Sequence, residues 1–249
     1  MQLDYPQKAN GMYLLSKHDF DEIATQVLHE YLPASLANPR PSDIDYLIQE
    51  CLCLLIKNQY LSYNGSILGM ITFDQTEWPA IGRAKEGTVI LEEGTIVVDP
   101  RLNSPEHRTR YRFTKAHEAS HWILHRSYHS PNNRVYDFRK DRSSIACRDS
   151  TIERYHWQRN RVWSDTDWEE WQADSLAAAV LMPREMFQEA FETAMRHNGL
   201  RQSYLMEGEK VFESRNVIRE TAAIFDVSQR AAQIRMCQFG LIRHNRFSA

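Results

Sequence analysis

Residues 112–125 decide the fold, and they read RFTKAHEASHWILH. The stretch contains His-Glu-x-x-His, with histidines at positions 117 and 121 and a glutamate at position 118. On an α-helix, residues four apart lie on one face, so His117 and His121 can bind one metal ion. Glu118 lies beside that face, where its carboxylate can contact a metal-bound water without binding the ion. Two neutral nitrogen ligands with a carboxylate base are typical of a zinc hydrolase.

The residues around the motif favour a helix. Thr114 is a suitable N-cap, because its hydroxyl can accept from a free backbone N–H of the first turn. Neither proline nor glycine occurs between Arg112 and Tyr128, and the alanines and large apolar residues suit a mostly buried helix. The alternative for the motif alone is a chance match, which we put at on the order of a few per cent for a chain of this composition.

His125 continues the same four-residue spacing, but it is a poor ligand for the same ion. The helix rises about 12 Å from residue 117 to residue 125. Zinc–nitrogen bonds are only about 2.0–2.1 Å long. We therefore expect His125 to pack in the interior or to contact a ligand, without binding the ion itself.

A third ligand is expected from residues 167–183, which read DWEEWQADSLAAAVLMP. The alanine-rich run indicates a second helix that ends at Pro183. Glu170 and Asp174 are four residues apart and share one face, so Glu170 can bind the metal while Asp174 hydrogen-bonds the outer nitrogen of a ligand histidine. Glu169 is the competitor, but it points about 100° away from that face. The alternative is that Glu169 and Glu170 are both solvated charges.

The two motifs together resemble those of the ImmA/IrrE metallopeptidases, and the Glu-x-x-x-Asp spacing is similar to that of the wider thermolysin-like zincins. The resemblance implies that one Zn²⁺ ion is bound by His117, His121 and Glu170. It also implies that Glu118 is the general base and that Asp174 orients a ligand histidine.

The resemblance extends over roughly residues 43–242. Residues 95–100 are similar to the strand that precedes the metal helix of that family, and residues 225–236 are similar to its C-terminal helical region. Three positions depart from the family pattern: Ser120 replaces glycine, Gln172 replaces glutamate, and Leu176 replaces phenylalanine. None of these residues is a proposed ligand. The long interval between His121 and Glu170 leaves open what covers the site.

We predict an α+β fold: a zincin-like metallopeptidase with a small mixed or antiparallel sheet packed on the metal helix, followed by a C-terminal helical region. Residues 1–41 are expected to form an N-terminal helix and linker, and residues 42–197 the metallopeptidase domain. Within that domain, residues 127–165 are expected to be an insertion or lid. Residues 198–249 complete the chain as a C-terminal, helix-turn-helix-like region.

The hydrophobic periodicity also predicts the individual elements. Residues 1–17 are expected to be weakly ordered. Besides the two helices of the site, helices are expected at residues 19–31, 43–57, 184–197, 207–225 and 228–239. Strands are expected at residues 60–63, 67–73, 80–83, 88–91 and 95–99, with Asn-Gly and Glu-Gly turns between them.

The segment from residue 127 to residue 165 is polar and rich in arginine, with scattered tyrosine and tryptophan. Such a mixture can bind nucleic acid, but we favour a solvated insertion with some buried aromatic residues. Three residues within it could stabilise the oxyanion of a tetrahedral intermediate: His156, Tyr155 and Arg148.

The C-terminal helices are spaced like a helix-turn-helix, with Ser228 as the N-cap of the second helix. That helix would expose Gln229, Arg230 and Gln233, and Arg235 is a further candidate. The alternative is a helical pair that packs on the peptidase core. We favour the alternative, because the net charge is −3 and no dense basic cluster occurs.

The composition excludes several other classes of protein. In 249 residues, 42% are hydrophobic and 25% are charged, as in ordinary globular proteins. An apolar run of about 18 residues is absent from the sequence, so no membrane span is expected, and residues 1–17 lack an apolar signal region. The four cysteines match neither a zinc knuckle nor a redox pair, which fits a reducing cytoplasm.

The sequence therefore predicts a cytoplasmic zinc-dependent endopeptidase in which a metal-activated water attacks a peptide bond, with Glu118 as general base. The resemblance implies the substrate, a helix-turn-helix transcriptional repressor cut in a regulatory response. The alternative is a DNA- or protein-binding regulator with a structural or degenerate zinc site. A structural zinc usually has four protein ligands, and only three are evident here.

Overall fold

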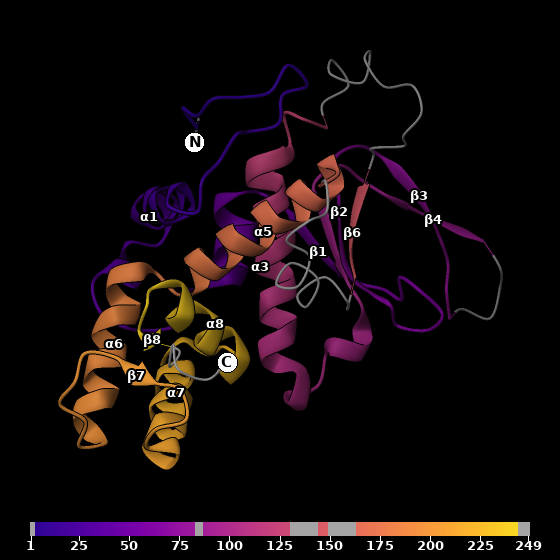
Figure 1. Cartoon of the computed structure of the whole chain (residues 1–249). Coiled ribbons are helices and arrows are strands. Elements are labelled where there is room, and N and C mark those ends of the chain that lie inside the picture. The colour runs from indigo at the N-terminus through magenta and orange to yellow at the C-terminus, as the bar shows by residue number, and fades with distance from the viewer. Residues whose placement is uncertain (1–2, 83–86, 130–143, 149–162, 244–249) are drawn as a thin grey trace. The chain divides into compact units, whose positions relative to one another are not determined.

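The computed structural model describes residues 3–82, 87–129, 144–148 and 163–243 (Figure 1). Within these residues the chain forms a mixed α+β structure of seven α-helices and three small sheets, which confirms the predicted α+β class. The chain packs as two compact units: residues 1–23 with 43–177, and residues 24–42 with 178–249. Helix α1 (Asp19–Tyr31) begins in the first unit and ends in the second. The domain boundaries expected from the sequence stay predictions.

A four-stranded mixed sheet is the base of the first unit. Its strands lie in the order β1 (Leu55–Asn58), β5 (Thr95–Val98), β2 (Ile67–Thr72) and β6 (Ser144–Arg148). β1 runs parallel to β5, and the other neighbours are antiparallel. All four residues of β5 are buried, as expected for a strand paired on both edges beneath a helix. A separate hairpin pairs β3 (Thr76–Pro79) with β4 (Thr88–Leu91).

Helix α3 (Arg108–His125) carries the His-Glu-x-x-His motif and packs against β2 and β5 (Figure 1). Every residue from Thr114 to His121 is buried. The predicted N-cap is wrong: the helix starts six residues before Thr114, after a 3-10 turn at Pro105–His107. Thr114 lies inside the helix and faces β2, where its methyl group packs near Gly69.

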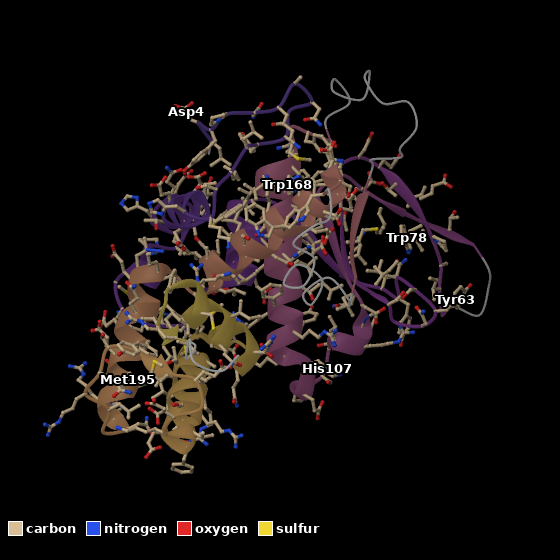
Figure 2. All side chains as sticks on the ribbon, in the orientation of Figure 1. Asp4, Tyr63, Trp78, His107, Trp168 and Met195 are labelled. Atoms are coloured by element: carbon tan, nitrogen blue, oxygen red, sulfur yellow. The ribbon has the colours of Figure 1, made fainter. Side chains whose placement is uncertain are left out.

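Helix α5 (Asp165–Leu181) is the second helix of the predicted pair. Trp168 projects from its first half (Figure 2), and its ring lies 4.8 Å from that of Trp163 and 5.4 Å from that of Trp171. The N-terminal segment packs on this helix, so the expectation of weak order is wrong for its described part. Met12 and Tyr13 are buried, and Lys8 pairs with Asp165 at 3.2 Å.

The helix predicted at residues 43–57 is only half right. It consists of α2 (Ile44–Tyr46) and one π-helical turn (Leu47–Cys51). Cys53 then adopts a left-handed conformation with φ 54°, and residues 55–58 form β1. The apolar spacing fitted a longer helix, but hydrogen bonding to β5, some 40 residues away in sequence, places this segment in the sheet.

Among the predicted strands, those at residues 67–73, 88–91 and 95–99 are confirmed as β2, β4 and β5. The strands predicted at residues 60–63 and 80–83 are not formed in the described residues, and β3 lies just before the second of them. β6 was not predicted, since its short sequence, SIACR, lies within the polar segment interpreted as an insertion.

The second unit is mainly helical. It contains α6 (Arg184–His197), α7 (Val211–Phe225) and α8 (Gln229–Gln238), with a short parallel pair of β7 (Leu205–Met206) and β8 (Ile242–Arg243). The rings of Phe187 and Phe225 pack in its core, 5.5 Å apart. None of the helices in the described part of the chain is long and apolar enough to cross a membrane.

The turn between α7 and α8 confirms one sequence prediction and corrects another. Ser228 caps α8, since its side chain accepts from the backbone N–H of Ala231 at 3.1 Å. Arg230 is exposed, as expected. Arg235 is not: it is buried, donates to the carbonyl of Met182 at 3.2 Å, and stacks over Phe239.

Candidate metal centre

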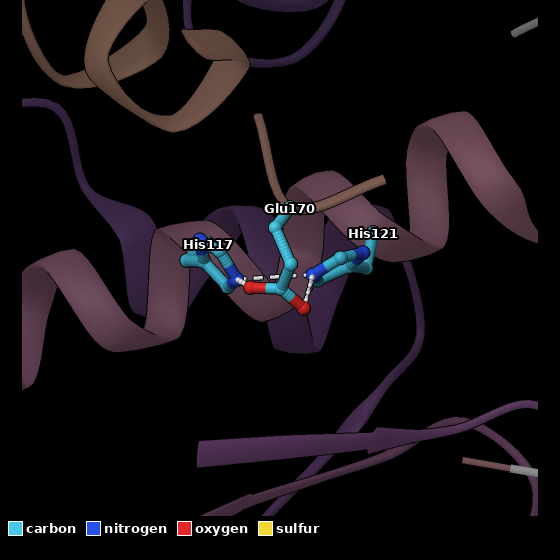
Figure 3. Close-up of side chains that lie close together, drawn as sticks. All are labelled: His117, His121 and Glu170. Carbon is cyan, nitrogen blue, oxygen red and sulfur yellow. Dashed lines mark hydrogen bonds and ion pairs between the residues drawn. The ribbon is translucent and has the colours of Figure 1, made fainter. Parts of the chain in front are cut away.

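His117 and His121 project from one face of α3, one turn apart (Figure 3). Their Nε2 atoms are 2.9 Å apart, and both side chains are fully buried. Burial and the neighbouring histidines hold the pKa of His121 well below its usual value, so this imidazole is neutral. The helix therefore presents two ring nitrogens to one point, as the spacing of the motif requires.

Glu170 reaches the same point from α5, and its carboxylate lies between the two imidazoles (Figure 3). Its oxygens are 3.5 Å from His117 Nε2 and 3.7 Å from His121 Nε2. One ligand atom from each of these three residues lies within 4.8 Å of the others. Glu169, the competitor, faces away and pairs with His129 at 2.6 Å. The structure thus brings together the three residues predicted as ligands, and their role in binding stays a prediction.

Asp174 lies one turn after Glu170 and hydrogen-bonds the outer nitrogen of His117, with Oδ1 2.8 Å from Nδ1. A carboxylate oxygen only accepts, so the proton of a neutral His117 lies on Nδ1. His117 Nε2 then has its lone pair directed at the convergence point. This is the contact that the sequence assigned to Asp174.

His125 contacts His121, with the two Nδ1 atoms 2.9 Å apart. Burial lowers the pKa of His125 to about 4. Its other ring nitrogen faces Gln172, with Nε2 3.0 Å from Oε1. Gln172 was not among the site residues predicted from the sequence. Its departure from the glutamate of the family pattern was the available signal.

Glu118 is fully buried beside the convergence point, and both of its carboxylate oxygens lack a hydrogen bond from any described residue. Burial raises its pKa to about 8, an effect that His117 offsets in part and that Glu170 and Asp174 increase. Gly69 of β2 leaves the space for this carboxylate, because a Cβ atom there would lie 2.6 Å from Glu118 Oε1. A glycine inside a strand often marks such a close approach, which was the signal for this residue.

These groups fit a divalent cation. The Nε2 atoms of two buried imidazoles face each other, and two buried carboxylates lack a full set of donors, an arrangement that is costly without a positive charge. Two nitrogens bound tetrahedrally to one zinc ion would lie about 3.3–3.4 Å apart, so the two rings, now 2.9 Å apart, would have to separate by roughly 0.4 Å to bind it. A donor set of two imidazoles and one carboxylate suits zinc and similar ions.

The three candidate oxyanion stabilisers are not tested by the structure. The backbone of Arg148 ends β6, but its side chain lies outside the described residues, as do Tyr155 and His156. Their roles stay predictions.

A helix bearing His-Glu-x-x-His, with a carboxylate from a neighbouring helix as the third candidate ligand, is typical of zinc metallopeptidases. The family comparison agrees: the sequence profile of the IrrE N-terminal-like domain, peptidase family M78, matches residues 100–236. The match covers more than half of the chain, so the chain belongs to this family, and the resemblance to ImmA/IrrE metallopeptidases is confirmed. A comparison with curated proteins finds no match.

Proposed function

We propose that the chain is a zinc-dependent endopeptidase, in which His117, His121 and Glu170 bind the metal and Glu118 is the general base. One observation carries the proposal: three ligand atoms converge within 4.8 Å, directly beside a buried carboxylate that lacks hydrogen-bond donors. A metal site with only a structural role does not require a buried carboxylate such as Glu118 beside its ligands. Membership of a metallopeptidase family supports the same reading.

The metal, when bound, would supply a Lewis acid that polarises the scissile carbonyl and lowers the pKa of water. Glu118 would accept a proton from the attacking water at a carboxylate oxygen and then deliver it to the leaving amine. Its lack of other hydrogen bonds keeps both oxygens available for this transfer. Asp174 would hold His117 in the tautomer that directs Nε2 at the metal.

We further propose that the substrate is a helix-turn-helix repressor and that cleavage serves a regulatory response in the cytoplasm. The substrate and the regulatory role rest on the family resemblance alone, and the cytoplasmic location rests on the cysteine pattern.

The rival function is a DNA-binding regulator, favoured by one observation: α8 follows α7 after a tight turn and exposes Gln229 and Arg230. The burial of Arg235 removes one of the predicted contacts. If the rival holds, Arg230→Ala weakens DNA binding and reduces its salt dependence. Unchanged binding in that variant would count against a role of α8 in the DNA groove.

Glu118→Gln tests the peptidase proposal. The variant should retain about one zinc ion per chain, because Glu118 is not a ligand, and should lose cleavage of a repressor substrate followed by mass spectrometry. Glu170→Ala is the matched control and should lose the metal as well. Cleavage that persists in Glu118→Gln would exclude this residue as the base.

A further inference from the structure

Gln172 lies on α5 between Glu170 and Asp174, and both ends of its amide are fixed. Its Nε2 donates to the backbone carbonyl of Tyr13 at 2.8 Å. A carbonyl oxygen can only accept, so the orientation of the amide is set by this contact. Oε1 must then be the atom that faces His125 Nε2, at 3.0 Å. Gln172 and His125 are both buried, so water does not compete for either bond.

This orientation determines where the proton of His125 lies. Oε1 of Gln172 can only accept, so His125 carries its proton on Nε2. In a neutral imidazole the other nitrogen is then an acceptor, which makes His125 Nδ1 the acceptor in its 2.9 Å contact with His121 Nδ1. His121 must therefore hold its proton on Nδ1, and its Nε2 lone pair faces His117 Nε2 and the carboxylate of Glu170.

We infer that Gln172 is a positioning residue that acts through His125 to hold His121 in its metal-binding tautomer. The inference rests on the proposed metal site. The two ligand histidines are thus held in different ways: His117 by the carboxylate of Asp174 directly, and His121 by an uncharged relay of two side chains that starts at the backbone of Tyr13.

A merely structural role for Gln172 is the competing explanation, since its bond to Tyr13 also ties the N-terminal segment to α5. Two substitutions separate the roles. Gln172→Met has a similar length and removes both hydrogen bonds. Gln172→Glu keeps an oxygen that can accept from His125 but cannot donate to the Tyr13 carbonyl. The relay to His121 requires an oxygen at position 172 that accepts from His125. The structural contact requires an N–H at position 172 that donates to the Tyr13 carbonyl.

The first readout is zinc affinity, measured by competition with a chromophoric chelator on the full-length chain. Gln172→Met should weaken zinc binding by roughly 10–100-fold, the range for lost partners of ligand histidines. Gln172→Glu should stay close to wild type. Equal losses in the two variants, or no loss in Gln172→Met, would overturn the relay.

The second readout needs no variant. Nitrogen NMR of the histidine rings in the zinc-loaded wild-type protein should find the proton of His125 on Nε2. A proton on Nδ1 of His125 would overturn the inference. If the protein proves to bind no zinc, the same spectra of the metal-free chain test the inference, since His121 should still carry its proton on Nδ1. A proton on Nε2 of His121 would overturn it. A protein that shows these tautomers and binds zinc but cleaves no substrate contradicts the peptidase proposal and leaves the relay intact.

Discussion

Glu118 is subject to two opposing requirements. Its proposed work as a base needs a carboxylate that can take up a proton, while complete burial without donors disfavours the charged form. The pKa of about 8 in the metal-free chain expresses this conflict. A nearby cation would relieve it, which ties the chemistry of this residue to metal binding.

The conflict predicts a pH-dependent effect on stability in metal-free protein. The folded pKa of Glu118, about 8, lies above its ordinary value of 4.5, so the stability associated with the protonated form is complete below pH 4.5 and is lost as the pH rises towards 8. Glu118→Gln does not titrate and escapes this loss. Its free energy of unfolding in urea, relative to wild type, should therefore rise by on the order of a few kcal/mol between pH 5 and pH 8.

Both proteins must be measured with a chelator present, so that neither binds metal. The titrations of His121 and His125 then contribute equally to the two free energies of unfolding and cancel in the difference. Curves that run parallel from pH 5 to pH 8 would mean that the Glu118 carboxylate is not buried as described.

Gly69 allows a second prediction for a single residue. An added Cβ would lie 2.5 Å from the Thr114 methyl group and 2.6 Å from Glu118 Oε1. Gly69→Ala should therefore displace Glu118, the proposed base, lowering peptidase turnover by roughly 10²-fold and stability by about 1–3 kcal/mol. Gly87→Ala is the control, because a Cβ there meets no atom within 4 Å. Equal turnover in the two variants would contradict the close approach.

At the scale of the elements, the two helices of the site were predictable because their information is local. Four-residue spacings in α3 and α5 put each pair of functional side chains on one face. The positions of β1 and of the start of α3 were predicted wrongly because they depend on contacts outside the local sequence pattern. The conformation of residues 55–58 depends on pairing with β5, and the first turns of α3 on proline-initiated 3-10 turns, neither of which is visible in local periodicity.

The helical spacing of Glu170 and Asp174 leads to a third prediction. Asp174→Ala removes the acceptor for His117 Nδ1 and should weaken metal binding roughly 10–100-fold, measured by chelator competition. Asp174→Asn keeps an oxygen that can accept the same proton and should lose much less. If the two variants bind metal equally badly, the negative charge of Asp174 is what matters, and the orienting role is wrong.

For the whole molecule, metal removal should have a large effect, because all the proposed ligands belong to one compact unit. Zinc at a thousand times its dissociation constant adds about 4 kcal/mol of stability. Stripping the metal should then lower the midpoint of thermal unfolding by on the order of 10 °C for a chain of this size. His121→Ala should have a low midpoint that chelator no longer changes. A wild-type midpoint insensitive to chelator would argue against metal binding.

The site was therefore predictable in part. The residues of the two motifs follow from spacing and resemblance, and the structure brings His117, His121, Glu170 and Asp174 together. The contacts behind them were not predictable, since Gly69 meets Glu118 across the sheet and Tyr13 meets Gln172 from a distant part of the chain. Such contacts depend on the tertiary fold and leave no periodic pattern in the sequence.

The bond between Tyr13 and Gln172 joins residues 159 positions apart. At the ribosome, roughly 5–20 residues are added per second, so about 8–32 s separate the synthesis of the two. The histidine pair of α3 is also made long before Glu170, its third partner. If Glu170 is the third ligand, a nascent chain carries the His-Glu-x-x-His helix for seconds without a complete metal site, and a translation product that stops short of α5 cannot assemble one. The proposed peptidase activity would then begin only after most of the protein has been made.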